Sequence, residues 1–166
     1  NSTSSPSLLG LETDLVSMGR DHRRGDENVS GSFTSGGTES DTLAVDGVLR
    51  ANDGLAACPA AEPPAVLEPV RESGGVVVAT DASGRVDLAA LEEALDALAD
   101  VNLVSVMTAN NETGVINDVG VVAETVTVHA PGAVFHTDAV HAAAWLALAD
   151  ACRGAHLVSL TGPEFR

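Results

Sequence analysis

Short apolar runs alternate with segments of helical periodicity over most of this sequence. Four runs stand out between turn-forming residues: VVVA at 76–79, LVSVM at 103–107, AVFH at 133–136 and HLVSL at 156–160. The segments between them carry apolar residues at helical spacing, as in the leucines of residues 88–98. Runs that are apolar on both faces indicate parallel strands covered by helices. We therefore predict an α/β fold with a mostly parallel sheet and helices on both faces.

The first part of the chain has a weaker pattern. Residues 1–30 are polar apart from a helical stripe, so we predict an N-terminal helix and a connector there. The stripe consists of Leu11, Leu15, Val16 and Met18. The segment SFTSGGTESDTLAV then predicts a short strand, a glycine turn and a helix that begins near Thr38. The apolar face of that helix holds Leu43, Val45 and Leu49.

More helices are expected further along the chain. PPAVLEPVRE, in a region rich in Ala, Pro and Glu, predicts a short helix opened by proline. Asp87 can cap the leucine helix, because its side chain can accept a hydrogen bond from a backbone N–H of the first turn. We also predict a helix weakened by valines and threonines at residues 118–130, and a strongly apolar helix at residues 139–153.

The charge balance argues against one class of partners. The chain carries a formal net charge of −16, from 24 acidic and 8 basic residues, and every basic residue is arginine. Binding to nucleic acid or to an anionic membrane needs clustered Lys and Arg, so we expect neither. The chain has no lysine, and therefore no side-chain amine that could form a Schiff base.

Cysteine usage and hydropathy favour the cytosol. Cys58 and Cys152 lie far apart without a CxxC motif, so we expect neither a disulfide framework nor a zinc site. No apolar run reaches the ~18 residues of a membrane span. We therefore expect a cytoplasmic protein, in which the helix and connector of residues 1–30 precede a domain at residues 31–166.

Polar clusters follow four predicted strands, and parallel strands bring such loops to one edge of a sheet. The clusters are TSGGTE at 34–39, NNETG at 110–114, HTD at 136–138 with His141, and TGPE at 161–164. The turn before Gly37 and Thr38 lets backbone N–H groups approach a phosphate, although an ordinary tight turn has the same composition. Asp138 can pair with a protonated ring nitrogen or merely cap the next helix.

The spacing of His136, Asp138 and His141 is also compatible with a metal site. Such a site needs a further clear carboxylate or histidine nearby, and the sequence offers none. We therefore predict no metal site.

The blocks VSVMTANNETGVINDV and GAVFHTDAVHAAA closely resemble the cysteine desulfurases, pyridoxal-phosphate enzymes of the class V aminotransferase group. FTSGGTESDTLAV and EPPAVLEPV resemble earlier blocks of that family in the same order. The resemblance covers residues 31–166. It implies an incomplete large cofactor-binding domain of fold-type I pyridoxal-phosphate enzymes, without the family's small C-terminal domain.

The resemblance assigns cofactor contacts residue by residue. The residues are Gly37, Thr38, Asn111, Asp138, His141 and Thr161. Gly37, Thr38 and Thr161 would contact the phosphate of pyridoxal 5'-phosphate, and Asn111 the ring hydroxyl. Asp138 would take the pyridinium nitrogen and keep it protonated. His141, where the family usually has glutamine, would donate a hydrogen bond to the ring oxygen.

The sequence departs from the family at the reacting positions. Pro63 stands where a histidine stacks on the cofactor ring, and proline cannot transfer a proton. In the closing SLTGPEFR, Pro163 takes the place of a second histidine. Glu164 takes the place of the lysine that forms the family's internal Schiff base. Covalent attachment of the cofactor through a lysine is therefore excluded for this chain.

The family reaction converts L-cysteine to L-alanine and passes persulfide sulfur to an acceptor protein, as in iron–sulfur cluster assembly, and the family is homodimeric. Because the lysine and the stacking histidine are replaced and the family's cysteine loop is missing, we expect no intact catalytic residue and no activity from this chain. Two alternatives stay open. One is a degenerate, non-catalytic binding homologue, and the other is a fragment of another pyridoxal-phosphate decarboxylase or lyase, which residues 1–30 resemble more.

Overall fold

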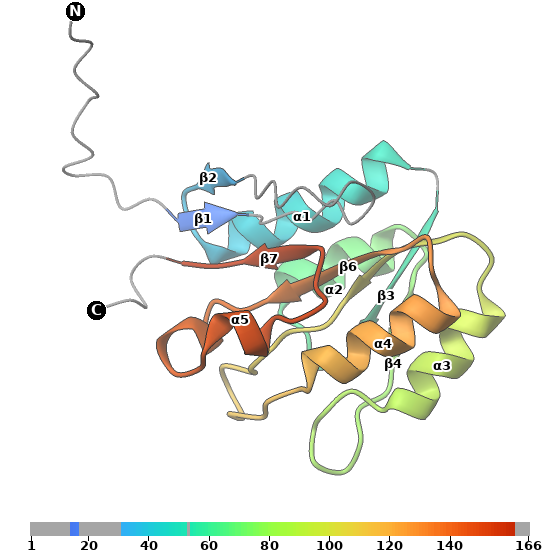
Figure 1. Ribbon diagram of the computed structural model, residues 1–166. Coiled ribbons are helices and arrows are strands. Elements are labelled where there is room, and N and C mark those ends of the chain that lie inside the picture. The colour runs from blue at the N-terminus through green and yellow to red at the C-terminus, as the bar shows by residue number, and fades with distance from the viewer. Residues whose placement is uncertain (1–13, 17–30, 53, 162–166) are drawn as a thin grey trace, which may run out of the picture.

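The computed structural model describes residues 14–16, 31–52 and 54–161, which form a seven-stranded sheet between two layers of helices (Figure 1). The strands are β1 (Asp14–Val16), β2 (Ser32–Thr34), β3 (Leu55–Pro59), β4 (Val76–Val78), β5 (Val101–Ser105), β6 (Val134–Asp138) and β7 (Leu157–Ser159). Their order across the sheet is β2-β1-β7-β6-β5-β3-β4.

Five of these strands run parallel, from β7 through β6, β5 and β3 to β4. β1 pairs antiparallel with both β7 and β2, which places an antiparallel ribbon at one edge. The predicted fold class, a mostly parallel sheet with helices on both faces, is confirmed. β3 was not predicted, because its sequence LAACP has small residues and lies in a stretch rich in Ala and Pro.

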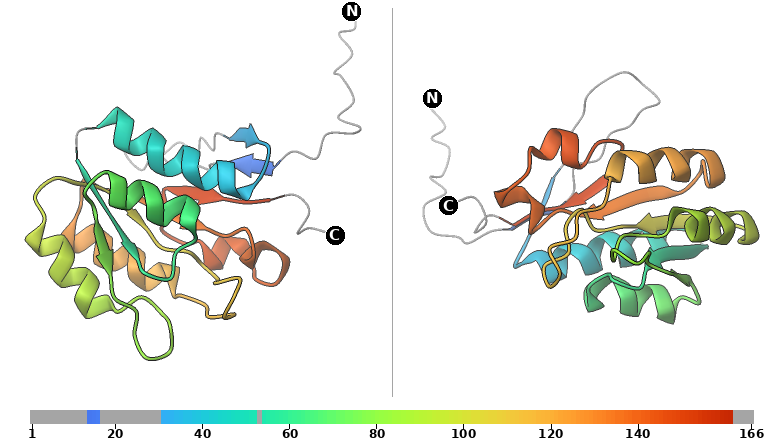
Figure 2. Two further views of the ribbon diagram at one scale, coloured as in Figure 1. Left: turned by 180° about the vertical axis from the view of Figure 1, so that it is seen from behind. Right: turned by 90° about the horizontal axis from the view of Figure 1, so that it is seen from below.

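Helices α1 (Gly37–Ala51) and α2 (Pro64–Glu72) cover one face of the sheet (Figure 2). Helices α3 (Leu88–Ala97), α4 (Val119–His129) and α5 (Leu148–Ala151) cover the other. Each face has its own apolar core. The smaller core contains Val45, Ala56, Cys58, Val66, Val70 and Leu103. The larger core contains Phe135, Leu91 and Leu95 together with valines of β5 and α4.

Local sequence signals fix several helix boundaries as predicted. Asp87 caps α3, because its side chain accepts a hydrogen bond from the backbone N of Ala90 at 3.1 Å. Asp118 caps α4 in the same way, through the backbone N of Val121 at 3.2 Å. Pro64 is the first residue of α2, where its missing N–H has no helical partner to lose.

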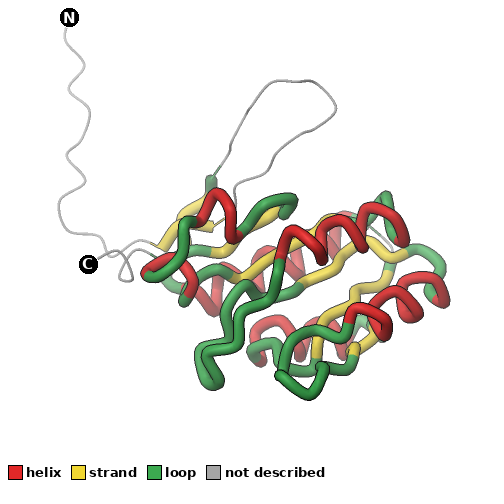
Figure 3. The backbone as a smooth tube through the Cα atoms, turned by 60° about the horizontal axis from the view of Figure 1, so that its bottom comes forward, coloured by secondary structure: helices red, strands yellow, loops and turns green. Residues whose placement is uncertain are grey.

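The predicted apolar helix at 139–153 is wrong as a single element (Figure 3). The chain forms a 3₁₀ turn, η1 (Ala142–Ala144), and then the single turn of α5. Leu146 and Leu148 pack against the larger core, whereas Trp145 is 86% exposed. A helix that is apolar all round needs cover on several sides. The described part of the chain covers this segment on one side. The segment therefore forms two short elements, η1 and α5, instead of one long helix.

Two further expectations near the start of the chain need correction. Leu43 is exposed, although Val45 is fully buried on the same helix, so the inward face of α1 is rotated from the predicted one. Residues 14–16, within the predicted helical stripe, form the strand β1, because β7 and β2 offer hydrogen-bonding partners on both sides. The remainder of the predicted N-terminal helix and connector lies outside the described residues.

Within the same described residues, every helix is too short or too polar to cross a lipid bilayer.

Candidate functional site

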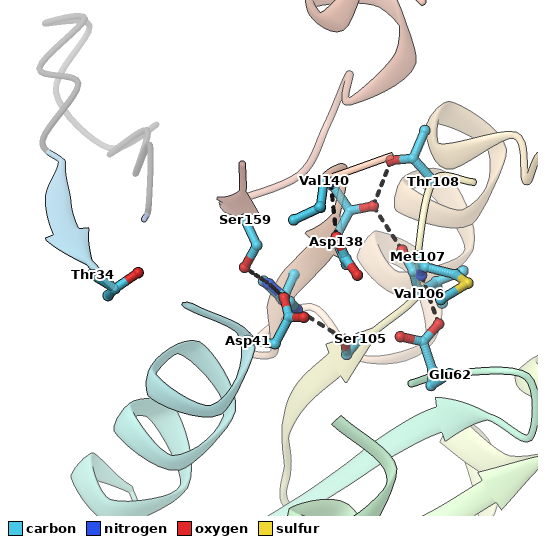
Figure 4. A network of polar contacts seen from close by, with 12 residues as sticks. Thr34, Asp41, Glu62, Ser105, Val106, Met107, Thr108, Asp138, Val140 and Ser159 are labelled. Atoms are coloured by element: carbon cyan, nitrogen blue, oxygen red, sulfur yellow. Dashed lines mark hydrogen bonds and ion pairs between the residues drawn. The ribbon is translucent and has the colours of Figure 1, made fainter. Parts of the chain in front are cut away.

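Buried polar residues gather where the parallel strands end (Figure 4). β5 ends at Ser105, β6 at Asp138 and β7 at Ser159, and all three side chains are buried. Parallel pairing aligns Ser105 with His136 and Asp138 with Ser159. The register therefore places hydroxyl, imidazole and carboxyl groups side by side at one edge of an otherwise apolar sheet.

His136 is fully buried between two serines. Its Nδ1 lies 2.8 Å from Ser105 Oγ, and its Nε2 lies 3.0 Å from Ser159 Oγ. Burial lowers the pKa of His136 to about 4, so the ring is neutral at pH 7. Because both ring nitrogens have hydroxyl partners, His136 acts as a structural bridge between β5 and β7. In the described part of the chain, His, Cys, Asp and Glu side chains form no metal-binding group of three or more.

Asp138 is 8% exposed and is held by its own turn. Its Oδ1 accepts a hydrogen bond from the backbone N of Val140 at 2.8 Å, and its backbone oxygen accepts one from Thr108 N at 2.8 Å. Burial raises the pKa of the Asp138 carboxyl, and the nearby His141 acts in the opposite direction. The end of β6 therefore fixes both the position and the orientation of this carboxyl group.

A second carboxyl group reaches the same place from α1. Asp41 is 3% exposed, and its Oδ1 lies 3.8 Å from His136 Nε2. Burial and the adjacent Asp138 carboxyl raise the pKa of Asp41 to about 8. Ser159 and Asp138 are hydrogen-bonding neighbours of this carboxyl, but no bond of good geometry reaches Oδ1 within the described residues.

Glu62 is a third buried carboxyl, placed between β3 and α2. Its Oε1 accepts a hydrogen bond from the backbone N of Met107 at 2.6 Å, while its Oε2 has no partner in the described structure. Burial raises the pKa of Glu62 well above its ordinary value. Asn110 Nδ2 also donates to the backbone oxygen of Ala61 at 3.0 Å. These two bonds tie the loop after β5 to the loop after β3.

The N-terminus of α1 approaches the end of β6 closely. A Cβ atom added to Gly37 would lie 2.9 Å from Val140 Cγ2, so only glycine allows this approach without displacement. No side chain caps the helix at Gly36. Backbone N–H groups at a helix N-terminus attract anions. The positive end of α1 therefore lies close to the loop that orients Asp138.

A shallow pocket of about 680 Å³ starts at the same helix terminus but follows the outer side of α1. It extends from Ser35 to Arg50, and neither Asp41 nor Asp138 lines it. Ser35 also donates from both its backbone N and its Oγ to Glu39 Oε2, each at 2.6 Å, which closes the turn before the helix. This pocket is separate from the buried carboxyl groups.

The described residues bring some of the predicted site residues together. Gly37 packs toward Val140, His141 lies near Asp138, and Thr161 is buried just beyond β7. Thr38 is exposed at the start of α1, and Asn111 is exposed in the loop that Asn110 anchors. Pro63 precedes α2 and is half-buried, beside Glu62. Pro163 and Glu164 lie outside the described residues.

Four buried polar residues of this site were missed by sequence reasoning. They are Asp41, Glu62, Ser105 and Ser159. For Asp41 a signal was present, because an acid one turn after Gly37 falls on the same side of α1 as Val45 and breaks the apolar face. Ser105 interrupts an apolar strand in the same way. Glu62 carries no such signal, since its burial depends on the loop after β5.

This arrangement suits a ligand with two opposite charges. Three buried carboxyl groups lie at one end, and no arginine forms an ion pair with them in the described structure. A helix N-terminus lies at the other end, facing the turn that holds Asp138. A ring with a cationic nitrogen and a phosphate group matches both features, because Asp41 Oδ1 and Glu62 Oε2 have no hydrogen-bond partner within the described residues and a helix N-terminus attracts anions.

Comparison with known proteins gives the family. Residues 27–148 match the family described as Aminotransferase class-V. The cysteine desulfurase IscS of Vibrio atlanticus (strain LGP32) is 41% identical over 101 residues, which are 55% of this chain and 24% of that protein. The IscS-like cysteine desulfurase of Mycobacterium tuberculosis (strain ATCC 25618 / H37Rv) is 45% identical over 96 residues, 51% of this chain and 24% of that protein.

The solved structure of DndA from Streptomyces lividans superposes with a TM-score of 0.68 at 30% identity, covering 80% of this chain and 38% of that one. The chain belongs to the class V aminotransferase family. Its predicted resemblance to cysteine desulfurases is confirmed, and the match spans about a quarter of the length of these curated relatives.

Proposed function

We propose that this chain is a cysteine desulfurase-like protein that binds pyridoxal 5'-phosphate without covalent attachment. The observation that carries the proposal is the pairing of a buried carboxyl cluster with the N-terminus of α1. Gly37 and Val140 bring these two features together. The family assignment supports the choice of cofactor.

The proposed contacts follow from the chemistry of each group. Asp138 faces the ring nitrogen, since a buried carboxylate is stabilised by a cation. Backbone N–H groups at Gly37 and Thr38, together with Thr161, contact the phosphate. Asn111 and His141 face the ring hydroxyl oxygen. When bound, the cofactor supplies an electron sink for an amino-acid substrate.

We do not expect the residues of this chain to carry out the full desulfurase reaction by themselves. Position 164 is glutamate rather than lysine, and Pro63 cannot hold or move a proton. L-cysteine, a sulfur-acceptor protein and a second subunit remain proposed partners of an intact relative. We also propose that residues 31–166 form one domain and that the protein is cytoplasmic. The two free cysteines of the chain support the cytoplasmic location.

Replacing Gly37 by alanine is expected to weaken pyridoxal 5'-phosphate binding about tenfold, the effect of losing roughly one hydrogen bond to a charged group. The added Cβ atom meets Val140 and pushes the start of α1 away from the phosphate position. Equilibrium dialysis measures the affinity. In a separate experiment, repeated dialysis against buffer without cofactor should remove all of the cofactor, because no lysine holds it covalently.

Gly47→Ala is the matched control, because a Cβ atom at this position of the same helix meets nothing within 4 Å. It should leave the affinity unchanged. The proposal fails if the unmodified chain does not bind the cofactor, or if both alanine variants bind as tightly as the unmodified chain.

A further inference from the structure

Asp41 is a buried acid to which the family resemblance assigns no role. It lies on the inward face of α1, and its Oδ1 has no hydrogen-bond partner within the described residues. An unpartnered carboxylate in such a place would carry a large desolvation penalty. The protonation state of the Asp41 carboxyl therefore depends on the groups around it.

Three elements present four groups to the Asp41 carboxyl. β6 contributes His136 and Asp138, β7 contributes the Ser159 hydroxyl, and the segment before α2 contributes Glu62 at longer range. His136 is neutral at pH 7, so it does not balance a negative charge. Two adjacent buried carboxyl groups cannot both be ionised without a counter-charge. One proton therefore remains between Asp41 and Asp138.

The hydrogen bonds of Asp138 decide which carboxyl holds this proton. Asp138 Oδ1 accepts the backbone N–H of Val140, and such a bond favours the ionised form. His141 also favours ionised Asp138, whereas Asp41 Oδ1 has no backbone donor. The proton thus resides on Asp41, whose raised pKa of about 8 agrees with this assignment.

Ser159 links the His136 ring to the Asp41 carboxyl. Neutral His136 has one donor nitrogen and one acceptor nitrogen, which its contacts with Ser105 and Ser159 use. With the proton on Nε2, His136 donates to Ser159 Oγ and accepts from Ser105 Oγ. The Ser159 hydroxyl can then donate to one oxygen of Asp41, which leaves the other oxygen to carry the proton toward Asp138.

We propose that Asp41 is a positioning residue: its protonated carboxyl donates a hydrogen bond to Asp138 and keeps Asp138 ionised, which makes the site select a ring that carries a protonated nitrogen. The inference rests on the proposed cofactor site and deepens it. Burial by itself favours a neutral Asp138, which a pyridinium nitrogen would not recognise. The hydrogen bond from Asp41 opposes this effect.

Two probes separate ring-nitrogen recognition from general binding. One is 4-deoxypyridoxine 5'-phosphate, which has the phosphate and the ring nitrogen but no aldehyde. The other is its 1-deaza analogue, in which a C–H group replaces the ring nitrogen. Calorimetric titration of each probe into the full chain gives two dissociation constants. Their ratio measures nitrogen selectivity, and a general loss of structure lowers both affinities without changing it.

Three variants test the role of Asp41. Asp41→Leu removes the donor and should reduce the selectivity ratio about tenfold, as expected for a hydrogen bond to a charged group. Asp41→Asn keeps an N–H donor of similar shape and should retain the ratio within about threefold. Combining Asp41→Leu with Asp138→Asn should give no further loss beyond Asp138→Asn, because Asp41 acts through Asp138.

Each other outcome overturns a stated part of the argument. If Asp138→Asn abolishes selectivity but Asp41→Leu leaves it unchanged, the role of Asp41 is refuted while the cofactor site stands. The same holds if Asp41→Asn loses as much selectivity as Asp41→Leu. If the unmodified chain binds neither probe, the proposed function fails and this inference fails with it. Should Asp41→Leu fail to fold, Asp41→Ala removes the same donor with a smaller side chain and takes its place in each of these comparisons.

Discussion

The free energy of unfolding is expected to fall as the pH rises from 6.5 to 8. Asp41 has a pKa raised to about 8, and the pKa of Glu62 is raised well above its ordinary value, in both cases chiefly by burial. Each group keeps a proton in the folded state that it releases in the unfolded state. Stability then decreases by about 1.4 kcal/mol per pH unit for each such proton.

The pH window follows from the sign of each shift. A carboxyl group whose pKa is higher in the folded state than in the unfolded state favours folding most at low pH. This contribution to the free energy of unfolding is lost as the pH rises from the unfolded pKa to the folded pKa. His136 has a lowered pKa of about 4, so it opposes this trend only below its unfolded pKa of about 6.5. Above pH 6.5 the buried carboxyl groups dominate, and Asp41 alone should account for a loss of roughly 2 kcal/mol between pH 6.5 and pH 8.

Urea denaturation at a series of pH values measures this slope. Asp41→Asn and Glu62→Gln should each flatten it, because the amide keeps the shape of the side chain and removes the ionisation. Glu93→Gln, at an exposed position of α3, is the control and should leave the slope unchanged. A stability that rises or stays level between pH 6.5 and 8 would show that these carboxyl groups are already ionised in the folded state.

Phe135→Ala is expected to reduce the free energy of unfolding by about 3–5 kcal/mol. Phe135 is 1% exposed at the centre of the larger core, and its removal leaves a cavity that the neighbouring strands cannot fill. The loss is a large fraction of the ~5–15 kcal/mol that stabilises a typical domain. It also affects the site, because His136 and Asp138 follow on the same strand.

Phe33→Ala is the matched control, since this phenylalanine lies on β2 and is 67% exposed. It should change the stability by less than about 1 kcal/mol. Thermal melts followed by circular dichroism allow the direct comparison. Equal losses for the two variants would mean that the packing around Phe135 has been assigned incorrectly.

The predictable parts of the fold depended on local signals. The strands β4 to β7 were predicted because short apolar runs need burial on both faces, and α3 because Asp87 and the leucine spacing agree. The prediction of a helix at 139–153 was wrong, because helical propensity does not indicate which sides of a segment the neighbouring elements will cover. β3 was missed because Ala and Cys give a strand no strong local preference.

The candidate site also has features that the sequence predicts and features that depend on the tertiary structure. The sequence by itself determined the family, the glycine pair at the start of α1, Asp138 at the end of β6, and the absence of lysine. Only the tertiary structure decided that Asp41 lies beside Asp138 and that Glu62 is buried within range of their charges, since these residues come from segments far apart in the chain. Their protonation depends on burial and on distances across the sheet, and neither quantity exists until the chain has folded.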